Sequence, residues 1–450
     1  MKIQSAKFLQ GKISLPGDKS ISHRAALLAS MATGETRIEN FATSADCAST
    51  LNCLEQLGVE IRRENSTVFI KGVGKTGFQK SKKPLDCGNS GTTMRLLSGI
   101  LAGQNFDSVL IGDESLSKRP MKRIIEPLTQ MGAKFESENG CAPLKIRGKN
   151  PLQAILYGLP IASAQVKSSI LLAGLNADGK TSVSEPSASA SGATASGNPP
   201  ADADGSDIVF TRDHTERMLR FLGANIEISN RKISVSGNAQ LTAQDLQIPS
   251  DISSAAFFLV AAACLENSEI VLPNVGLNPT RNAVLEVLMD FGADIEIANE
   301  REVSGEPIGD LRVKGHKNLI PKVSANIISG KIIANLIDEI PILAVFGAQI
   351  EGGLEIRGAQ ELRVKESDRI AAIVKNLRRM NATVEEFDDG FRVSKSNLKG
   401  AKIDSFSDHR IAMAFSIAAL FADGETEISG AESAGVSFPG FFDELKNVAK

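Results

Sequence analysis

Apolar side chains recur at helical spacing along the whole chain, and these stretches alternate with short strand patterns. Residues 411–417 are almost purely apolar, which predicts a helix that must be buried. Residues 283–289 have the spacing of an amphipathic helix, and residues 293–297 alternate apolar with polar side chains, as a half-buried strand does. This alternation of helices and strands predicts an α/β protein.

One order of elements repeats six times: an apolar helix, a Gly or acidic turn, a short strand and a second helix. The period is about 70–90 residues, so each copy is a supersecondary unit of its own. A Gly or acidic turn precedes each predicted strand, at residues 34–40, 109–112, 179–183, 267–271, 352–356 and 424–428. Five of the second helices end at a residue suited to a left-handed C-cap, namely Gly58, Gly132, Gly223, Gly292 and Asn381. Six copies divide into two domains of three, and the polar stretch 240–249 marks the change of domain.

Two segments stand outside the repeats. Residues 1–17 are predicted to form a strand pair that either half of the chain can accommodate. Residues 186–207 are nearly all Ser, Ala, Gly, Pro and Asp, a composition that cannot bury a core and predicts a flexible insertion. A solvated insertion without function is favoured over a docking loop.

Composition excludes several classes of protein. A chain of 450 residues is too long for one core. Its net charge of −3 (50 basic minus 53 acidic residues), with no Trp and one Tyr, argues against a nucleic-acid-binding surface. The five Cys form no CxxC pair and the four His are far apart, so neither disulfides nor a zinc site is indicated. No signal, transit or membrane-spanning pattern is present, which predicts a cytoplasmic protein.

Five basic or polar clusters each precede an apolar helical run. Each cluster combines free backbone N–H groups, the positive end of a helix dipole and a cation, the arrangement by which proteins hold phosphate or carboxylate. Five clusters in one chain predict a pocket for more than one anion. They span residues 17–24, 88–95, 163–168, 363–369 and 407–410.

Each cluster also has a structural interpretation. Lys19, Ser20 and Arg24 can grip one phosphate from a shared helix face, or they can be a capped helix with solvated cations. Residues 89–93 form a backbone nest suited to an anion, although turns also favour Gly. The cations of residues 117–123, Arg119 among them, repel one another unless an anion or solvent separates them.

The remaining clusters carry further candidates. Ser163 can cap a helix, and Gln165 can also bind a hydroxyl or carboxylate. Asp338 can satisfy a helix dipole or serve as a base within a cationic pocket. Lys365 and Arg369 lie four residues apart, as in a surface ion-pair helix, whereas Arg410 at the tip of an apolar helix is difficult to explain as a solvated charge.

At these residues the chain resembles the 5-enolpyruvylshikimate-3-phosphate (EPSP) synthase family of enolpyruvyl transferases. The resemblance runs nearly from end to end, apart from residues 186–207. It is carried by seven motifs, at residues 15–24, 88–93, 118–121, 163–168, 212–216, 363–369 and 407–410.

The resemblance implies a fold of two similar globular domains with an interdomain cleft, each domain built from three βαβαββ units around buried helices. The first strand pair then belongs with the C-terminal half. One domain comprises residues 1–19 and 241–450, on the phosphoenolpyruvate side. The other comprises residues 20–240, on the shikimate 3-phosphate side.

The family's reaction transfers the enolpyruvyl group of phosphoenolpyruvate to the 5-hydroxyl of shikimate 3-phosphate and releases phosphate. The resemblance implies no metal, no organic cofactor and no nucleic-acid or membrane partner, and we expect a monomer. That reaction requires an acid and a base, and we expect Glu366 to be the acid, Asp338 the base and Lys19 an aid to either proton transfer. The implied substrate-binding residues are Lys19, Ser20, Arg24, Asn89, Gly91, Arg119, Ser163, Gln165, Arg212, Asp338, Lys365, Arg369 and Arg410.

Two alternatives compete with this assignment. The sister enzyme that uses UDP-N-acetylglucosamine shares the fold and relies on a loop Cys, but residues 112–119 contain none. Cys141 is only superficially similar to that Cys. A non-catalytic anion-binding protein of the same fold is the second alternative, and the presence of Asp338, Glu366 and Arg410 argues against it. Some family members have a Pro where this chain has Leu96 and a Lys where it has Val436.

Overall fold

The computed structural model describes residues 1–186, 208–317, 319–323 and 325–450, so most of the predicted insertion lies outside the described residues. The chain divides into two compact units. Unit 1 comprises Met1–Asp18, Pro249–Glu302 and Pro307–Lys450, and unit 2 comprises Lys19–Ile248 and Val303–Glu306.

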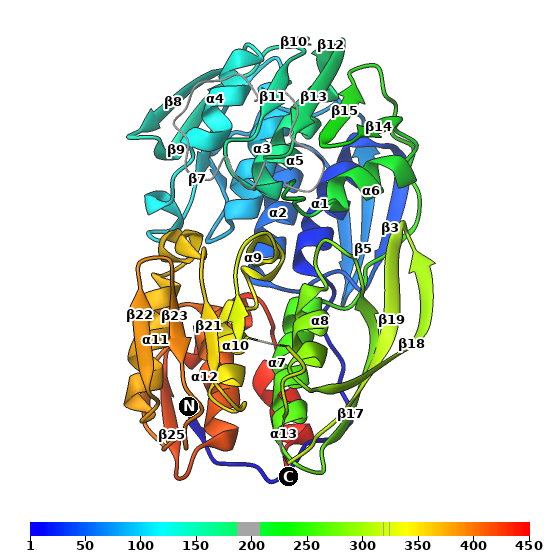
Figure 1. Cartoon of the computed structure of the whole chain (residues 1–450). Helices are drawn as coiled ribbons and strands as arrows, with labels where there is room; N and C mark the ends of the chain where they lie inside the picture. The colour runs from blue at the N-terminus through cyan, green and yellow to red at the C-terminus, as the bar shows by residue number, and fades with distance from the viewer. Residues whose placement is uncertain (187–207, 318, 324) are drawn as a thin grey trace. The chain divides into compact units, whose positions relative to one another are not determined.

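Unit 2 contains three four-stranded sheets of one topology (Figure 1). Across each sheet, one edge strand pairs in parallel with its neighbour, and the other neighbouring strands pair antiparallel. The first sheet has the order β16 (Leu246–Gln247), β3 (Thr33–Glu39), β5 (Thr67–Val73) and β4 (Glu60–Glu64). The second is β6 (Leu85–Asp86), β7 (Asp107–Ile111), β9 (Cys141–Arg147) and β8 (Lys134–Glu138). The third is β11 (Leu156–Gly158), β13 (Lys180–Ser184), β15 (Lys232–Ser236) and β14 (Ile226–Ser229), beside the short pair β10 (Leu152–Gln153) and β12 (Ala177–Asp178).

Unit 1 repeats this topology twice and then shortens it. Two of its sheets are β2 (Gln10–Lys12), β17 (Glu269–Gly276), β19 (Glu306–Lys314) and β18 (Asp294–Val303), and β20 (Ile327–Ile328), β21 (Leu354–Ile356), β23 (Gly390–Val393) and β22 (Val384–Phe387). The third is β24 (Lys402–Asp404), β25 (Thr426–Ser429) and β1 (Lys2–Ile3). The first two strands do not pair with each other as predicted, because β1 joins β25 and β2 joins β17.

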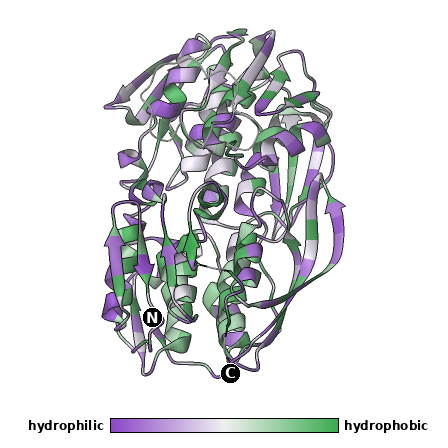
Figure 2. Ribbon diagram, viewed as in Figure 1, coloured by the Kyte–Doolittle hydropathy of each residue, from purple (hydrophilic) through white to green (hydrophobic). Residues whose placement is uncertain are grey.

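Each unit is built around three apolar helices, each of which leads into a sheet. These are α1 (Lys19–Met31), α3 (Gly91–Ala102) and α5 (Ala164–Gly174) in unit 2, and α7 (Ile252–Cys264), α10 (Ile340–Gly347) and α12 (His409–Phe421) in unit 1. Every residue of α10 and nearly every residue of α7 and α12 is buried. Each unit has a hydrophobic core of its own. Figure 2 shows hydrophobic residues along the helices and alternating colours along the exposed strands.

A second set of helices covers the cores with one face. It consists of α2 (Ala45–Gln56), α4 (Lys122–Gln130), α6 (His214–Phe221), α8 (Ala283–Asp290), α11 (Arg369–Arg379) and α13 (Phe441–Val448). Shorter helical segments are η1 (Leu116–Lys118), α9 (Ile332–Leu336), η4 (Gln360–Val364) and η5 (Ala431–Val436). No helix among the described residues is long and apolar enough to span a bilayer.

The helix ends follow the sequence signals closely. Gly58, Gly132, Gly223 and Gly292 have φ between 88° and 104°, and Asn381 has a φ of 65°. Each stands two residues beyond the last residue of α2, α4, α6, α8 or α11 and starts the turn into the next strand. The predicted C-caps and the repeated α/β architecture are therefore confirmed.

Candidate functional site

The start of α1 carries the first predicted cluster of unit 2. Lys19 is the first helical residue, and its Nζ lies 3.0 Å from Oδ2 of Asp46 in the first turn of α2. Arg24 is buried, with Nη1 donating to the carbonyl oxygen of Ser20 at 2.9 Å. The other guanidinium nitrogens donate to two hydroxyls, Nε to Thr215 at 2.7 Å and Nη2 to Ser168 at 2.9 Å. Arg24 is therefore held in one orientation.

The start of α3 forms the second cluster. Ser90 caps the helix by accepting from the N–H of Thr93, which leaves Gly91 as the first helical residue. Asn89 donates to Asp113 at 2.7 Å and accepts from Nη2 of Arg119 at 2.7 Å.

The cations of residues 117–123, which overlap the end of η1, have different surroundings. Arg119 is 8% exposed and also donates to Ser115 at 3.2 Å. Its neighbour Lys118 is exposed and pairs with Glu114 at 2.7 Å. The run is therefore not a uniform charged surface turn, because Arg119 turns inward towards Asn89.

The start of α5 is the third cluster, and it contains a contact that the sequence analysis missed. Ser163 caps the helix through the N–H of Val166. Gln165 accepts from Nη1 of Arg95 at 2.6 Å and donates to Oγ1 of Thr92 at 2.9 Å. Arg95 follows Gly91 by one helical turn, a spacing that could have identified it.

These contacts close a ring through four helices of unit 2. In order, α1 contacts α2 (Lys19–Asp46), α2 contacts α3 (Thr50–Thr93), α3 contacts α5 (Arg95–Gln165), and α5 contacts α1 (Ser168–Arg24). The helix starts that carry the predicted residues are therefore fixed to one another. Arg212, the remaining candidate, is half-buried in the segment before α6.

In unit 1, Arg369 is the first residue of α11 and is 1% exposed. Its Nε donates to Oδ2 of Asp408 at 2.8 Å, and its Nη2 donates to Oε2 of Glu366 at 2.5 Å. Asp408 is buried and also caps α12 by accepting from the N–H of Arg410 at 2.9 Å. Asp408 thus joins the starts of two helices, a role that the sequence analysis did not assign.

Three arginines surround Asp338, which lies between α9 and α10. Oδ1 of Asp338 is 3.6 Å from Nη1 of Arg369 and 3.5 Å from Nε of Arg410, and Oδ2 is 3.7 Å from Nη1 of Arg281. Arg410 also donates to the carbonyl oxygen of Asp338 at 2.9 Å. The carboxylate predicted as a base is therefore placed in a strongly positive environment.

No sequence motif marks Arg281, because no basic cluster precedes α8. Arg281 is 3% exposed and donates from Nη2 to the hydroxyl of Ser253 at 2.6 Å. Ser253 in turn donates to the buried carboxylate of Glu339. Burial lowers the pKa of Arg281, but Glu339, Asp18, Asp251 and Asp338 together raise it above its ordinary value, so the guanidinium stays charged.

Lys365 differs from these arginines. It follows η4 directly and precedes α11, so Lys365 and Arg369 do not share a helical face. Burial lowers the pKa of the half-buried Lys365 amine, and the nearby Asp338, Glu361 and Glu366 oppose this shift. Lys365 is therefore the cation of unit 1 that loses its proton most readily among those with a resolved shift.

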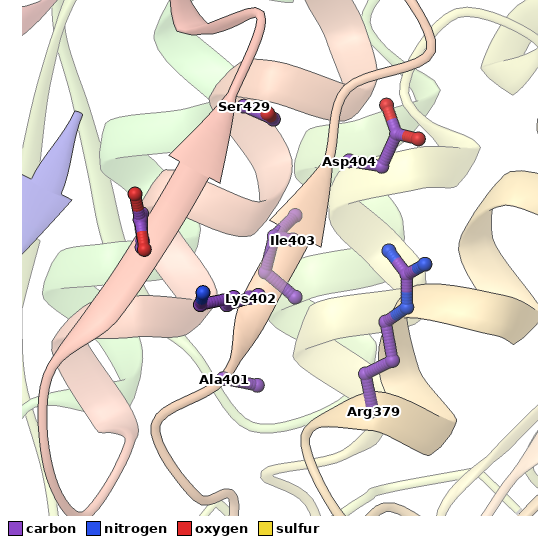
Figure 3. A pocket seen from close by; sticks show the side chains of 7 residues that line it. Arg379, Ala401, Lys402, Ile403, Asp404 and Ser429 are labelled. Atoms are coloured by element: carbon purple, nitrogen blue, oxygen red, sulfur yellow. The ribbon is translucent and has the colours of Figure 1, made fainter.

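An open hollow of about 580 Å³ lies elsewhere on unit 1, beside β24 and the end of α11 (Figure 3). Arg379, Lys402, Asp404 and Glu427 line it with charges of both signs. It contains none of the predicted site residues. Among the described residues, no group of three or more His, Cys, Asp or Glu is placed to hold a metal ion.

Comparison with known proteins identifies the family. The model of the family described as EPSP synthase (3-phosphoshikimate 1-carboxyvinyltransferase) matches residues 3–445. The chain belongs to the EPSP synthase family. This confirms the resemblance inferred from the seven motifs.

Relatives and solved structures agree with this membership of the EPSP synthase family. A protein of Koribacter versatilis (strain Ellin345), named 3-phosphoshikimate 1-carboxyvinyltransferase, is 48% identical over 453 residues, covering 100% of this chain and 99% of the relative. A protein of the same name from Geobacillus kaustophilus (strain HTA426) is 46% identical over 445 residues, covering 98% of each. The structure of EPSP synthase from Acinetobacter baumannii has a TM-score of 0.83 at 43% identity and covers 99% of this chain and 97% of that chain.

Proposed function

We propose that the protein transfers the enolpyruvyl group of phosphoenolpyruvate to the 5-hydroxyl of shikimate 3-phosphate and releases phosphate. The observation that carries this proposal is the match of the EPSP synthase family along residues 3–445. The clusters at the starts of the buried helices supply the cations that two anionic substrates require.

Residues of unit 2 provide most of the proposed shikimate 3-phosphate site. The side chain of Lys19 and the hydroxyl of Ser20 stand at the positive end of α1, and Arg24 is oriented by its three hydrogen bonds. A guanidinium held in this way binds an anion with little loss of side-chain freedom. The proposed ligands of shikimate 3-phosphate are Lys19, Ser20, Arg24, Ser163, Gln165, Asp338 and Lys365, and Asn89 and Arg212 complete the substrate-binding set.

Phosphoenolpyruvate carries a carboxylate and a phosphate, and planar guanidinium groups suit both. Arg369 and Arg410 already contact carboxylates of the protein, Asp408 and Asp338, so their positions are set before substrate arrives. Arg119 is set in the same way by Asn89. The proposed ligands of phosphoenolpyruvate are Lys19, Gly91, Arg119, Gln165, Arg369 and Arg410.

The chemistry requires an acid and a base. Protonation of the methylene carbon of phosphoenolpyruvate makes the adjacent carbon electrophilic, and the 5-hydroxyl oxygen then bonds to it while losing its proton. Loss of a proton from the new methyl group and of phosphate from the adjacent carbon completes the transfer. We assign the acid to Glu366 and the base to Asp338, with Lys19 assisting either proton transfer.

The arginines favour this reaction electrostatically. The intermediate keeps its carboxylate and phosphate, so charge persists throughout the transfer. Fixed guanidinium groups stabilise such charge without reorganising during the reaction. Arg369 is the most buried of them, and its Nη2 lies 2.5 Å from Oε2 of Glu366. This contact couples the position of the proposed acid to that of the anion-binding guanidinium.

A phosphate-release assay tests the proposal. Phosphate should appear when phosphoenolpyruvate and shikimate 3-phosphate are both present, and with neither substrate alone. Release with UDP-N-acetylglucosamine as acceptor, or no release with either acceptor, would contradict the proposal.

A variant of Cys141 separates this enzyme from its sister enzyme. Cys141 begins β9, and its Sγ lies 3.7 Å from the carbonyl oxygen of Lys118. Because the proposed reaction uses no thiol, Cys141→Ser should retain its rate of phosphate release. Loss of activity in a folded Cys141→Ser protein would instead support the Cys-dependent chemistry.

A further inference from the structure

Lys167 of α5 is 1% exposed and lies between two buried carboxylates of unit 2. Its Nζ is 2.7 Å from Oε1 of Glu185 and 2.6 Å from Oε1 of Glu216, and it donates to the carbonyl oxygen of Thr211 at 3.2 Å. Glu185 follows β13 and Glu216 lies in the first turn of α6. These three charged side chains therefore join α5, α6 and the end of β13.

Stability alone does not explain this cluster. Burial raises the pKa of the Glu216 carboxyl above its ordinary value, although Lys167 opposes the shift. Among the described residues, Oε2 of Glu185 and Oε2 of Glu216 have no hydrogen-bond partner. Replacing such a buried ion cluster with uncharged side chains of similar volume is often neutral or stabilising, so its presence points to a role in positioning.

The residues next to the cluster show what it positions. Ser168 follows Lys167, and Thr215 precedes Glu216, so the ionic link and the pair of hydroxyls join the same two helices. The two hydroxyl oxygens are 2.7 Å apart. Arg24 donates to both of them, from Nη2 to Ser168 and from Nε to Thr215. The spacing of α5 and α6 thus sets the orientation of Arg24.

Thr211 extends the cluster to the segment that leads into α6. Its N–H donates to Oε1 of Glu185 at 3.2 Å, and its hydroxyl donates to the same oxygen at 2.8 Å. Glu185 is itself fixed, because its N–H donates to the carbonyl oxygen of Arg231 at 2.8 Å. The start of α6, including Thr215, is therefore tied to the sheet as well as to α5.

We propose that Lys167, Glu185 and Glu216 form a brace that positions Arg24 for shikimate 3-phosphate, acting through Ser168 and Thr215. They are positioning residues, since none of them contacts the substrate in this proposal. The inference rests on the assignment of Arg24 to shikimate 3-phosphate. The brace sets the affinity for that substrate and leaves the affinity for phosphoenolpyruvate unchanged.

The variant Glu216→Gln tests the brace while leaving the Lys167–Glu185 pair in place. Calorimetry should show that the Kd for shikimate 3-phosphate rises about tenfold, as for residues coupled through shared contacts. The KM for phosphoenolpyruvate should be unchanged. The matched control is Glu227→Gln, which removes an exposed partner of Lys180 in the same unit and should change neither value. A normal Kd in folded Glu216→Gln would overturn the proposal.

Combining Glu216→Gln with Arg24→Lys distinguishes an effect through Arg24 from a general loss of structure. If the brace acts through Arg24, adding Glu216→Gln to Arg24→Lys should weaken binding of shikimate 3-phosphate no further. Effects that multiply in the double variant would overturn the brace. An unchanged Kd in Arg24→Lys alone would overturn the assignment of Arg24, which is a failure of the proposed site and not of the brace alone.

A triple variant keeps the test decisive if Glu216→Gln unfolds. Lys167→Met combined with Glu185→Gln and Glu216→Gln removes all three charges together, so no buried ion is left unpaired. We expect a Tm close to that of the parent protein and a Kd for shikimate 3-phosphate raised about tenfold. Normal substrate affinity in this variant would show that the cluster has no positioning role.

Discussion

Nη1 of Arg281 lies 3.7 Å from Oδ2 of Asp338, on the opposite carboxylate oxygen from the one that Arg369 and Arg410 approach. Asp338 is the proposed base and Arg281 is buried, so the pair combines a candidate catalytic group with a permanent charge. A cation at this distance favours the ionised carboxylate, which is the form that accepts a proton.

Replacing Arg281 should therefore alter the pH dependence of the reaction. In Arg281→Met, the acidic limb of the kcat/KM profile should move to higher pH, because the carboxylate loses one of its stabilising charges. Chemical denaturation should show a loss of about 3–5 kcal/mol in the free energy of unfolding, since buried acids lose their partner. Arg281→Lys, which keeps the charge, should shift the profile less. The exposed Arg312→Met serves as control, and a profile in Arg281→Met that matches it would contradict the role.

The lowered pKa of Lys365 predicts an alkaline limit on substrate binding. The folded protein releases the Lys365 proton below the ordinary value of 10.5, so kcat/KM for shikimate 3-phosphate should fall as pH rises through that window. The unfolded chain binds this proton more tightly, so the contribution of Lys365 to the free energy of unfolding increases with pH over the same window. Lys365→Arg should remove the alkaline fall, and a fall that persists in that variant would assign it to another group.

Glu366→Gln tests the proposed proton donor. The amide can still accept from Arg369, so both substrates should bind with nearly normal affinity. Without a transferable proton, kcat should drop by about 10²–10⁴-fold. Glu386→Gln, which alters a partner of Arg363 in the same unit, is the matched control. Near-normal turnover by Glu366→Gln would show that the acid is assigned wrongly.

Gly91→Ala tests the start of α3. A Cβ at this position would lie 2.7 Å from Nη1 of Arg95, so the guanidinium that donates to Gln165 must shift. Loss of this charged hydrogen bond should raise the KM for phosphoenolpyruvate by about tenfold. Gly435→Ala is the control, because a Cβ there meets no atom within 4 Å. Equal KM values for the two variants would remove Gly91 from the proposed site.

Local signals determined the repeated elements of this protein. The helices α2, α4, α6, α8 and α11 end before a Gly or Asn with positive φ, and alternating strands follow, because left-handed caps and strand patterns depend on neighbouring residues. Purely apolar runs such as residues 411–417 identified the buried helices, since no polar face is available for solvent. The motifs at the helix starts were sufficient to recognise the family.

Tertiary structure alone decided which charges face one another. Lys167 and Arg119 both belong to basic motifs, yet Lys167 is bound by two buried glutamates and Arg119 by Asn89. Arg281 carried no local signal because its acidic partner Asp338 is 57 positions further along the chain (338 − 281). The same holds for β1 and β2, which pair with strands hundreds of residues away. Such contacts depend on how helices and sheets pack, and the pattern of neighbouring residues along the chain does not specify that packing.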